Sequence, residues 1–221
     1  MCGSFLLMAL YSDLIKYYSI DVEALWEYVP GDYFPNRNAP IVIDDGKRML
    51  QFAKWGFPFS GKSRPVINAR AETVTSKPMF KSSFFYRRCV IPANGFYEWK
   101  QEQSGKKAKY RIGLRDEPLI SLGGIYKISR DENSIEQVTF VIITTEANEQ
   151  LKPVHHRMPL IVRKEQLDLW LNNSTPQKHI MSILANDTYD GALVIEKETK
   201  EEASDSPKDS GGENPDQISL F

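Results

Sequence analysis

Short strand-like runs dominate the first 195 residues of this 221-residue chain, and they constrain its fold more than any other feature. The runs are rich in β-branched and aromatic residues, and turn pairs such as Asn94-Gly95 and Ser104-Gly105 separate several of them. They do not alternate regularly with helical segments. The sequence therefore predicts an α+β fold, a single domain over residues 1–195 around a curved, largely antiparallel β-sheet with short helices. The predicted strands are residues 4–11, 40–43, 49–56, 89–92, 96–100, 109–114, 118–128, 136–144 and 160–162.

Helical patterns are fewer. Asp21 is a candidate N-cap for a helix in which Val22, Leu25, Trp26 and Val29 follow i, i+3, i+4, i+7 spacing. Residues 164–171 and 177–185 are two further candidate helices, and no internal repeat is visible.

The composition changes after Ile195. Residues 196–216 hold eight acidic residues and three lysines, a charge of −5, so the rest of this chain of net charge −1 carries +4. Such a polar segment cannot bury enough apolar surface to offset its ordering entropy, and we predict a flexible acidic linker. A body of charge +4 could meet a polyanion, although an ordinary solvated surface explains it as well.

The chain holds two cysteines, three histidines and no run of the roughly 18 apolar residues that a membrane helix needs. Its first ten residues lack the basic start and cleavage site of a signal peptide. Cys2 and Cys89 cannot form a disulfide framework, and with three histidines they offer little for zinc. We therefore expect a cytoplasmic protein with reduced thiols, no membrane contact, no metal and no cofactor.

The amino terminus combines two reactive groups. Removal of Met1, which is usual before a small residue, would leave Cys2 with a free α-amine and a thiol on one carbon skeleton. With reference pKa values near ~8 and ~8.5, both groups have a reactive fraction at neutral pH. The amine can form a Schiff base with an aldehyde, and the thiol can then close a thiazolidine ring. Gly3 would allow close approach of a bulky partner. An accidental cysteine at this position is the alternative.

Two internal segments carry polar residues suited to a site. Asn68, Arg70 and Glu72 lie within five residues and could form a hydrogen-bonded corner or contact a phosphate, unless they only begin a short capped helix. Glu98 lies among three aromatic residues, Phe96, Tyr97 and Trp99, so its side chain should be partly desolvated. Desolvation raises a carboxyl pKa and suits a general acid or base; a surface glutamate on an edge strand is the alternative.

A third segment places His155 beside His156 and Arg157. Adjacent residues of an extended chain point to opposite sides, so only one histidine should face a given cleft. A histidine can transfer protons near neutral pH, and an arginine can hold a phosphate through two hydrogen bonds. Adjacent histidines have poor geometry for a metal, and we expect no zinc here.

Together these segments resemble the SRAP family (SOS response-associated peptidases, also described as abasic-site processing proteins). The resemblance rests on five segments that occur in one order and covers residues 1 to about 162. It implies an α+β fold around a curved sheet, binding to single-stranded DNA, and a covalent crosslink to the ring-opened aldehyde of abasic sites. The segments are Met1-Cys2-Gly3, Trp55-Gly56-Phe57, the run from Asn68 to Thr73, the run from Cys89 to Trp99, and the run from His155 to Pro159.

By position, the resemblance makes Cys2 the crosslinking residue, Asn68 the residue that orients its amine and thiol, and Glu98 the acid or base. It makes His155 the residue that promotes opening of the sugar ring. Where the family commonly has an arginine this chain has Ser4, and residues 192–195 are a candidate remnant of a late family strand. The DNA contacts that the resemblance implies are Gly3, Trp55, Arg70, Arg157 and Met158.

The last five residues, 217–221, are similar to the bacterial sliding-clamp-binding peptide. Gln217 would make polar contacts while Leu220 and Phe221 fill apolar pockets, and the acidic linker would supply reach. Docking of this tip on its own domain is the alternative.

We therefore predict a monomeric, nucleoid-associated protein that crosslinks to abasic sites in single-stranded DNA, with a weak lyase activity if the imine stalls. An autoprocessing cysteine peptidase with Cys2 as nucleophile, His155 as base and Asn68 as orienter is one alternative. A clamp-tethered DNA-binding adaptor without enzymatic activity is the other.

Overall fold

Five β-strands close into a barrel at the centre of the computed structural model, which describes residues 2–21, 28–59, 64–130, 134–185 and 189–198. Around the barrel, β10 pairs with β4, β4 with β3, β3 with β6, β6 with β9, and β9 again with β10. Only the β4–β10 pairing in this ring is parallel. The barrel strands are β3 (Asn38–Asp44), β4 (Arg48–Trp55), β6 (Arg88–Ala93), β9 (Ile120–Arg130) and β10 (Glu136–Glu146).

Two short strands attach to the carboxyl-terminal half of β10. The strand β5 (Asn68–Arg70) runs parallel to residues 142–144, and β11 (Arg157–Pro159) runs antiparallel to residues 144–146. Thr144 is paired with Arg70 in one strand and with Pro159 in the other. This end of β10 therefore brings together two segments that lie almost 90 residues apart in the sequence.

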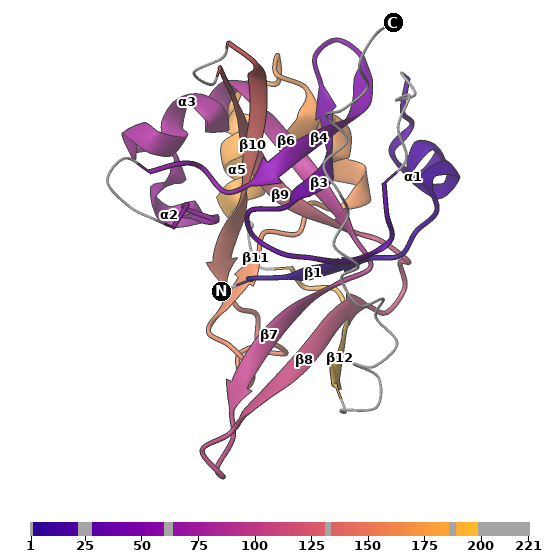
Figure 1. Cartoon of the computed structure of the whole chain (residues 1–221), viewed down its shortest axis with the longest axis vertical. Helices are drawn as coiled ribbons and strands as arrows, with labels where there is room; N and C mark the ends of the chain where they lie inside the picture. Colours follow the sequence, from indigo (N-terminus) through magenta and orange to yellow (C-terminus); the bar gives the residue numbers. More distant parts are fainter. Residues whose placement is uncertain (1, 22–27, 60–63, 131–133, 186–188, 199–221) are drawn as a thin grey trace, which may run out of the picture.

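A second, antiparallel sheet places the amino terminus beside the predicted glutamate strand. Its order is β12 (Leu193–Lys197), β8 (Lys107–Leu114), β7 (Gly95–Gln101), β1 (Phe5–Leu7) and β2 (Gly31–Tyr33). Phe5 lies opposite Phe96, only two residues before Glu98. In Figure 1 the hairpin of β7 and β8 extends away from the barrel.

The fold class is confirmed, and most predicted strands appear within two residues of their expected ends. The segment 4–11 is a strand only over β1, because Tyr11 begins the helix α1 (Tyr11–Tyr18), which buries Leu14 and Tyr18. Of the segment predicted as strand 160–162, only Ile161 makes an isolated bridge, to Leu122.

The helices predicted at 164–171 and 177–185 are present as the 3-10 turn η1 (Lys164–Gln166), α4 (Leu167–Leu171) and α5 (Gln177–Ala185). The sequence patterns do not predict the helices α2 (Ala71–Val74) and α3 (Pro78–Tyr86), apart from the short capped helix given as an alternative at 68–73. The helix expected after Asp21 falls largely on residues 22–27, which lie outside the described residues. No helix in the described ranges is long and apolar enough to cross a membrane.

Trp55 belongs to the core that joins the two sheets. Its side chain is fully buried and packs against Phe5 and Phe140, with ring centroids 5.4 and 5.9 Å apart. Its indole N–H donates to the carbonyl of Ile67 at 3.0 Å. The barrel uses this side chain as packing volume, and the predicted contact of Trp55 with DNA stays a prediction that its burial does not support.

The predicted start of the acidic linker at residue 196 is also wrong. The strand β12 continues to Lys197, and the side chains of Glu196, Lys197 and Glu198 form ion pairs with Arg111, Glu102 and Lys109. The folded domain therefore continues to residue 198. The rest of the predicted linker, 199–216, and the predicted clamp-binding residues Gln217, Leu220 and Phe221 lie outside the described residues.

Arg88 ties two helix ends together from inside the protein. Its side chain is 1% exposed, and its guanidinium donates to the carbonyls of Phe84, Phe85, Trp170 and Asn172 at 2.7 to 3.0 Å. Burial lowers its pKa to about 10, which still leaves it protonated at neutral pH. The cation therefore caps the carboxyl ends of both α3 and α4.

Replacing Arg88 with leucine should lower the free energy of unfolding by about 3–5 kcal/mol, because four carbonyls, two of them in the buried residues Phe84 and Trp170, lose their donor. Urea unfolding followed by circular dichroism would measure this. The neighbouring Arg87→Leu is the matched control and should change the free energy of unfolding by less than about 1 kcal/mol. Equal losses in the two variants would contradict the assigned role of Arg88.

Candidate active site

Cys2, Asn68, Glu98 and His155 come together from four separate segments. Cys2 precedes β1, Asn68 begins β5, Glu98 lies in β7, and His155 lies in the loop between β10 and β11. The side-chain amide of Asn68 donates to the backbone carbonyl of Cys2 at 3.0 Å, and His155 Nε2 lies 4.0 Å from Glu98 Oε2. The charge of Glu98 also acts on the Cys2 thiol. The four residues that the sequence singled out as catalytic therefore form one cluster.

The Cys2 thiol is fully buried and protonated. Its S–H donates to the carbonyl of Ser4, with Sγ 3.6 Å from the oxygen. Burial, and then the nearby charge of Glu98, raise the pKa of this thiol far above its ordinary value. Activated cysteine nucleophiles show the opposite shift. The thiol can therefore react only after a base has taken its proton.

The side-chain amide of Asn68 uses its nitrogen in a hydrogen bond, while its oxygen can still accept one. While its Nδ2 holds the Cys2 carbonyl, its Oδ1 is buried and has no hydrogen-bond partner among the described residues. A buried acceptor of this kind is costly unless a donor reaches it. An amine on Cys2 would be such a donor.

Glu98 and His155 have pKa values shifted in opposite directions. Burial raises the pKa of Glu98, whose side chain is 2% exposed, to about 6, and burial lowers the pKa of His155. His155 Nδ1 lies 3.0 Å from the backbone nitrogen and 3.1 Å from the backbone oxygen of Arg157, which orients the ring with its Nε2 toward Glu98. The pair thus offers a carboxylate that can accept a proton and an imidazole that can donate one.

Arg157 does not extend freely from this cluster. Its side chain is 8% exposed and forms a two-pronged ion pair with Glu72, and its Nη2 also donates to the carbonyl of Thr144 at 2.6 Å. The ion pair lowers the pKa of Glu72. The predicted phosphate contact of Arg157 stays a prediction, and a phosphate would have to compete with Glu72.

Two cavities lie beside the cluster and share Arg70 in their linings; together they are called the groove below. One, of about 580 Å³, reaches toward the loop before β11, and the other, of about 510 Å³, reaches toward α3 and Asn68. The first is lined by Arg70, Glu72, Thr73, Glu146, Lys152, His156 and Arg157. The second is lined by Phe59, Val66, Asn68, Arg70, Lys77, Pro78, Met79 and Phe80.

Phe59 is the aromatic residue that the sequence reasoning missed. It is 39% exposed in this groove, whereas the predicted Trp55 is buried. Its place four residues after Trp55 could have drawn attention to it. Met158 is fully buried and its sulfur accepts the backbone N–H of Asn148, so its predicted DNA contact stays a prediction without support from its burial. Gly3 is half-buried beside Cys2, and its role stays a prediction.

The described residues contain no group of three or more His, Cys, Asp or Glu side chains that could hold a metal ion.

Comparison with known proteins agrees with the resemblance seen in the sequence. The family model described as SOS response associated peptidase (SRAP) matches residues 1–199. The abasic site processing protein YoaM of Bacillus subtilis (strain 168) is 36% identical over 193 residues, covering 83% of this chain and 85% of the relative. The abasic site processing protein YoqW of the same organism is 34% identical over 198 residues, covering 83% and 86%. A crystal structure of a protein from Bacteroides thetaiotaomicron superimposes with a TM-score of 0.79 at 26% identity, covering 95% of this chain and 97% of that one.

Proposed function

Because this chain belongs to the SRAP family, we propose that it processes abasic sites in single-stranded DNA by forming a covalent crosslink through Cys2. One observation carries the proposal: Asn68 holds Cys2 beside Glu98 and His155, next to the groove with its cationic residues. The relatives named above as abasic site processing proteins support the choice of substrate.

The reaction begins once hydrolysis has removed Met1 and freed the Cys2 amine. The amine adds to the aldehyde carbon of the opened sugar and water leaves, which gives an imine. The Cys2 sulfur then adds to the imine carbon while its proton passes to the imine nitrogen, and a thiazolidine results. These steps release one water molecule and need no oxidant or reductant.

Each member of the cluster has a distinct role in this scheme. The unpartnered Oδ1 of Asn68 accepts a hydrogen bond from the Cys2 amine. This contact aims the lone pair of the amine nitrogen at the aldehyde carbon. His155 donates its Nε2 proton to the ring oxygen of the closed sugar as the ring opens. Glu98, largely ionised at neutral pH, accepts protons from the amine and the thiol.

The groove holds the strand on both sides of the reacting sugar. Arg70, Lys77 and Lys152 contact phosphates, and Phe59 provides a surface on which a base stacks. The autoprocessing peptidase, with Cys2 as nucleophile and His155 as base, stays an alternative that needs the same removal of the thiol proton. Binding of the tail to a sliding clamp remains a separate prediction.

Blocking the amine should abolish the crosslink while leaving DNA binding intact. Wild-type protein incubated with a single-stranded oligonucleotide bearing one abasic site should give a heat-stable shifted band on a denaturing gel. A variant with a short uncleaved extension before Cys2 should give no such band, because its Cys2 nitrogen is an amide. Intact DNA is the control, and mass spectrometry verifies that Met1 is absent from the wild type. A band of equal strength from the extended variant would overturn the proposal.

A further inference from the structure

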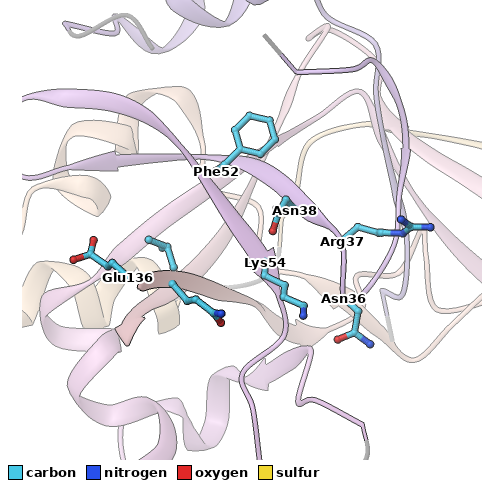
Figure 2. Close-up of a pocket in the computed structure, with 8 residues that line it drawn as sticks. Asn36, Arg37, Asn38, Phe52, Lys54 and Glu136 are labelled. Atoms are coloured by element: carbon cyan, nitrogen blue, oxygen red, sulfur yellow. The ribbon is translucent and has the colours of Figure 1, made fainter. Parts of the chain in front are cut away.

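A cavity of about 520 Å³ opens at the other end of β10, away from the crosslinking cluster. It lies where β10 begins, whereas β5 and the groove lie along residues 142–144 of the same strand. From Gln137 to Ile143 the strand rises about 20 Å, at roughly 3.4 Å per residue. Figure 2 shows that Lys54 and Asn36 approach each other on one side of this cavity and that Glu136 lies on the opposite side. The lining residues are Asn36, Arg37, Asn38, Phe52, Lys54, Glu136, Gln137 and Val138.

The chemistry of this cavity suits a nucleotide. Asn36, Asn38 and Gln137 supply amide groups, which can both donate to and accept from base edges. Phe52 supplies an aromatic ring and Lys54 an exposed ammonium group that can meet a phosphate. Its volume lies within the range of about 300–1,000 Å³ that is typical of small-ligand sites.

Glu136 is the one acidic side chain that lines the cavity. Arg130 lies directly opposite it in the β9–β10 register. A carboxylate here can accept a hydrogen bond from the exocyclic amine of a base.

Paired positions on one face of the sheet lead from this cavity toward the groove, and among them Lys54 is exposed, Lys127 is half-buried and Thr139 is buried. Lys54 lies opposite Asn38 on β3 and opposite Thr139 on β10, and Thr139 lies opposite Lys127 on β9. Residues paired in this way project from the same face of a sheet. The ammonium of Lys127 lies 4.6 Å from the centre of the Phe57 ring. That ring packs against Phe80, which lines the groove next to Asn68.

We propose that the cavity at Lys54 binds a nucleotide of the same single strand that is crosslinked at Cys2, with Lys127 along the path between the two sites. The inference rests on the proposed function and specifies how much DNA the protein engages. A span of about 20 Å corresponds to about six stacked nucleotides at 3.4 Å each. An oligonucleotide that covers the crosslink site alone would not reach this cavity.

Binding of intact single-stranded DNA by Lys54→Glu tests the inference. Fluorescence anisotropy with an oligonucleotide of about twenty nucleotides should show roughly tenfold weaker binding than the wild type at low salt. The slope of log K against log salt should also fall by about 0.7, the value for one phosphate contact on a single strand. Lys106→Glu, the same charge change at an exposed residue of the β7–β8 turn, is the matched control and should bind like the wild type. Equal affinities of the wild type and both variants would overturn the inference.

Measured rates of crosslinking distinguish a failure of this inference from a failure of the proposed function. With about three nucleotides on each side of an abasic site, short of the estimated six, Lys54→Glu should crosslink as fast as the wild type. With about ten nucleotides on each side it should crosslink more slowly at limiting protein, because only the longer strand spans both sites. Equal rates on both lengths would reject the second site and keep the crosslinking activity. If Lys54→Glu binds DNA more weakly but the wild type forms no crosslink, the crosslinking activity is rejected and the second site is kept.

Discussion

Cys2→Ala should form no heat-stable adduct with single-stranded DNA that bears an abasic site. The variant keeps an amine at residue 2 and can still form an imine, but it lacks the sulfur that closes the thiazolidine ring. An imine hydrolyses on heating, whereas the ring holds the carbon through two heteroatoms. Denaturing gel electrophoresis after boiling measures the difference, and the expected loss is complete. Borohydride reduction before boiling should trap the remaining imine and restore a band.

Cys89 provides the matched control for this experiment. It is the only other cysteine of the chain and is fully buried in β6, where burial alone raises the pKa of its thiol. Cys89→Ala should therefore crosslink at the wild-type rate. Loss of the adduct in Cys89→Ala with retention in Cys2→Ala would reverse the assignment and overturn the proposed chemistry.

Glu98→Gln should slow crosslink formation by about 10²- to 10⁴-fold, the usual contribution of a positioned acid or base. Glutamine has nearly the shape of glutamate, so it keeps the packing in β7 while removing the group that accepts protons from the amine and the thiol. A time course of the gel band at saturating DNA measures the rate.

The same substitution should stabilise the folded protein at alkaline pH. Burial holds the pKa of Glu98 at about 6 in the folded state, above the ordinary 4.5. The folded state therefore binds this proton more tightly than the unfolded chain, and its stability falls as the pH rises from about 4.5 through 6. The difference between the folded and unfolded pKa values corresponds to a loss of folding stability on the order of 2 kcal/mol at pH 8. Glu98→Gln should restore this stability. Urea unfolding at pH 4.5 and pH 8 measures this, since the gain should appear only at the higher pH.

Glu102→Gln is a suitable control, because Glu102 lies just after β7 and pairs with Lys197 at the surface. Loss of a surface ion pair changes stability by less than about 1 kcal/mol, and the crosslinking rate should not change. A Glu98→Gln protein that reacts at the wild-type rate, or is less stable at pH 8, would contradict the assigned role of Glu98.

Local patterns were enough to predict most of the strands. Residues 38–44, 48–55 and 120–130 contain β-branched or aromatic side chains, which favour strands. This preference can be read from each segment without knowledge of its partners. Closure of the barrel was not predictable, because it depends on the parallel pairing of β4 with β10, strands separated by some 80 residues. The helix α1 was also missed, because the apolar run before it continues into its first turn.

The sequence by itself determined which residues could carry the chemistry, and the tertiary structure decided which side chains are buried, paired or exposed. Cys2, Asn68, Glu98 and His155 follow from residue type and order, since few side chains can supply an amine with a thiol, an amide, a carboxylate and an imidazole. Burial depends instead on contacts between segments distant in the sequence. These contacts place Trp55 and Met158 in the core, pair Arg157 with Glu72, and leave Phe59 and Lys54 on the surface. No short-range pattern encodes such contacts, because each is made by a strand or helix from elsewhere in the chain.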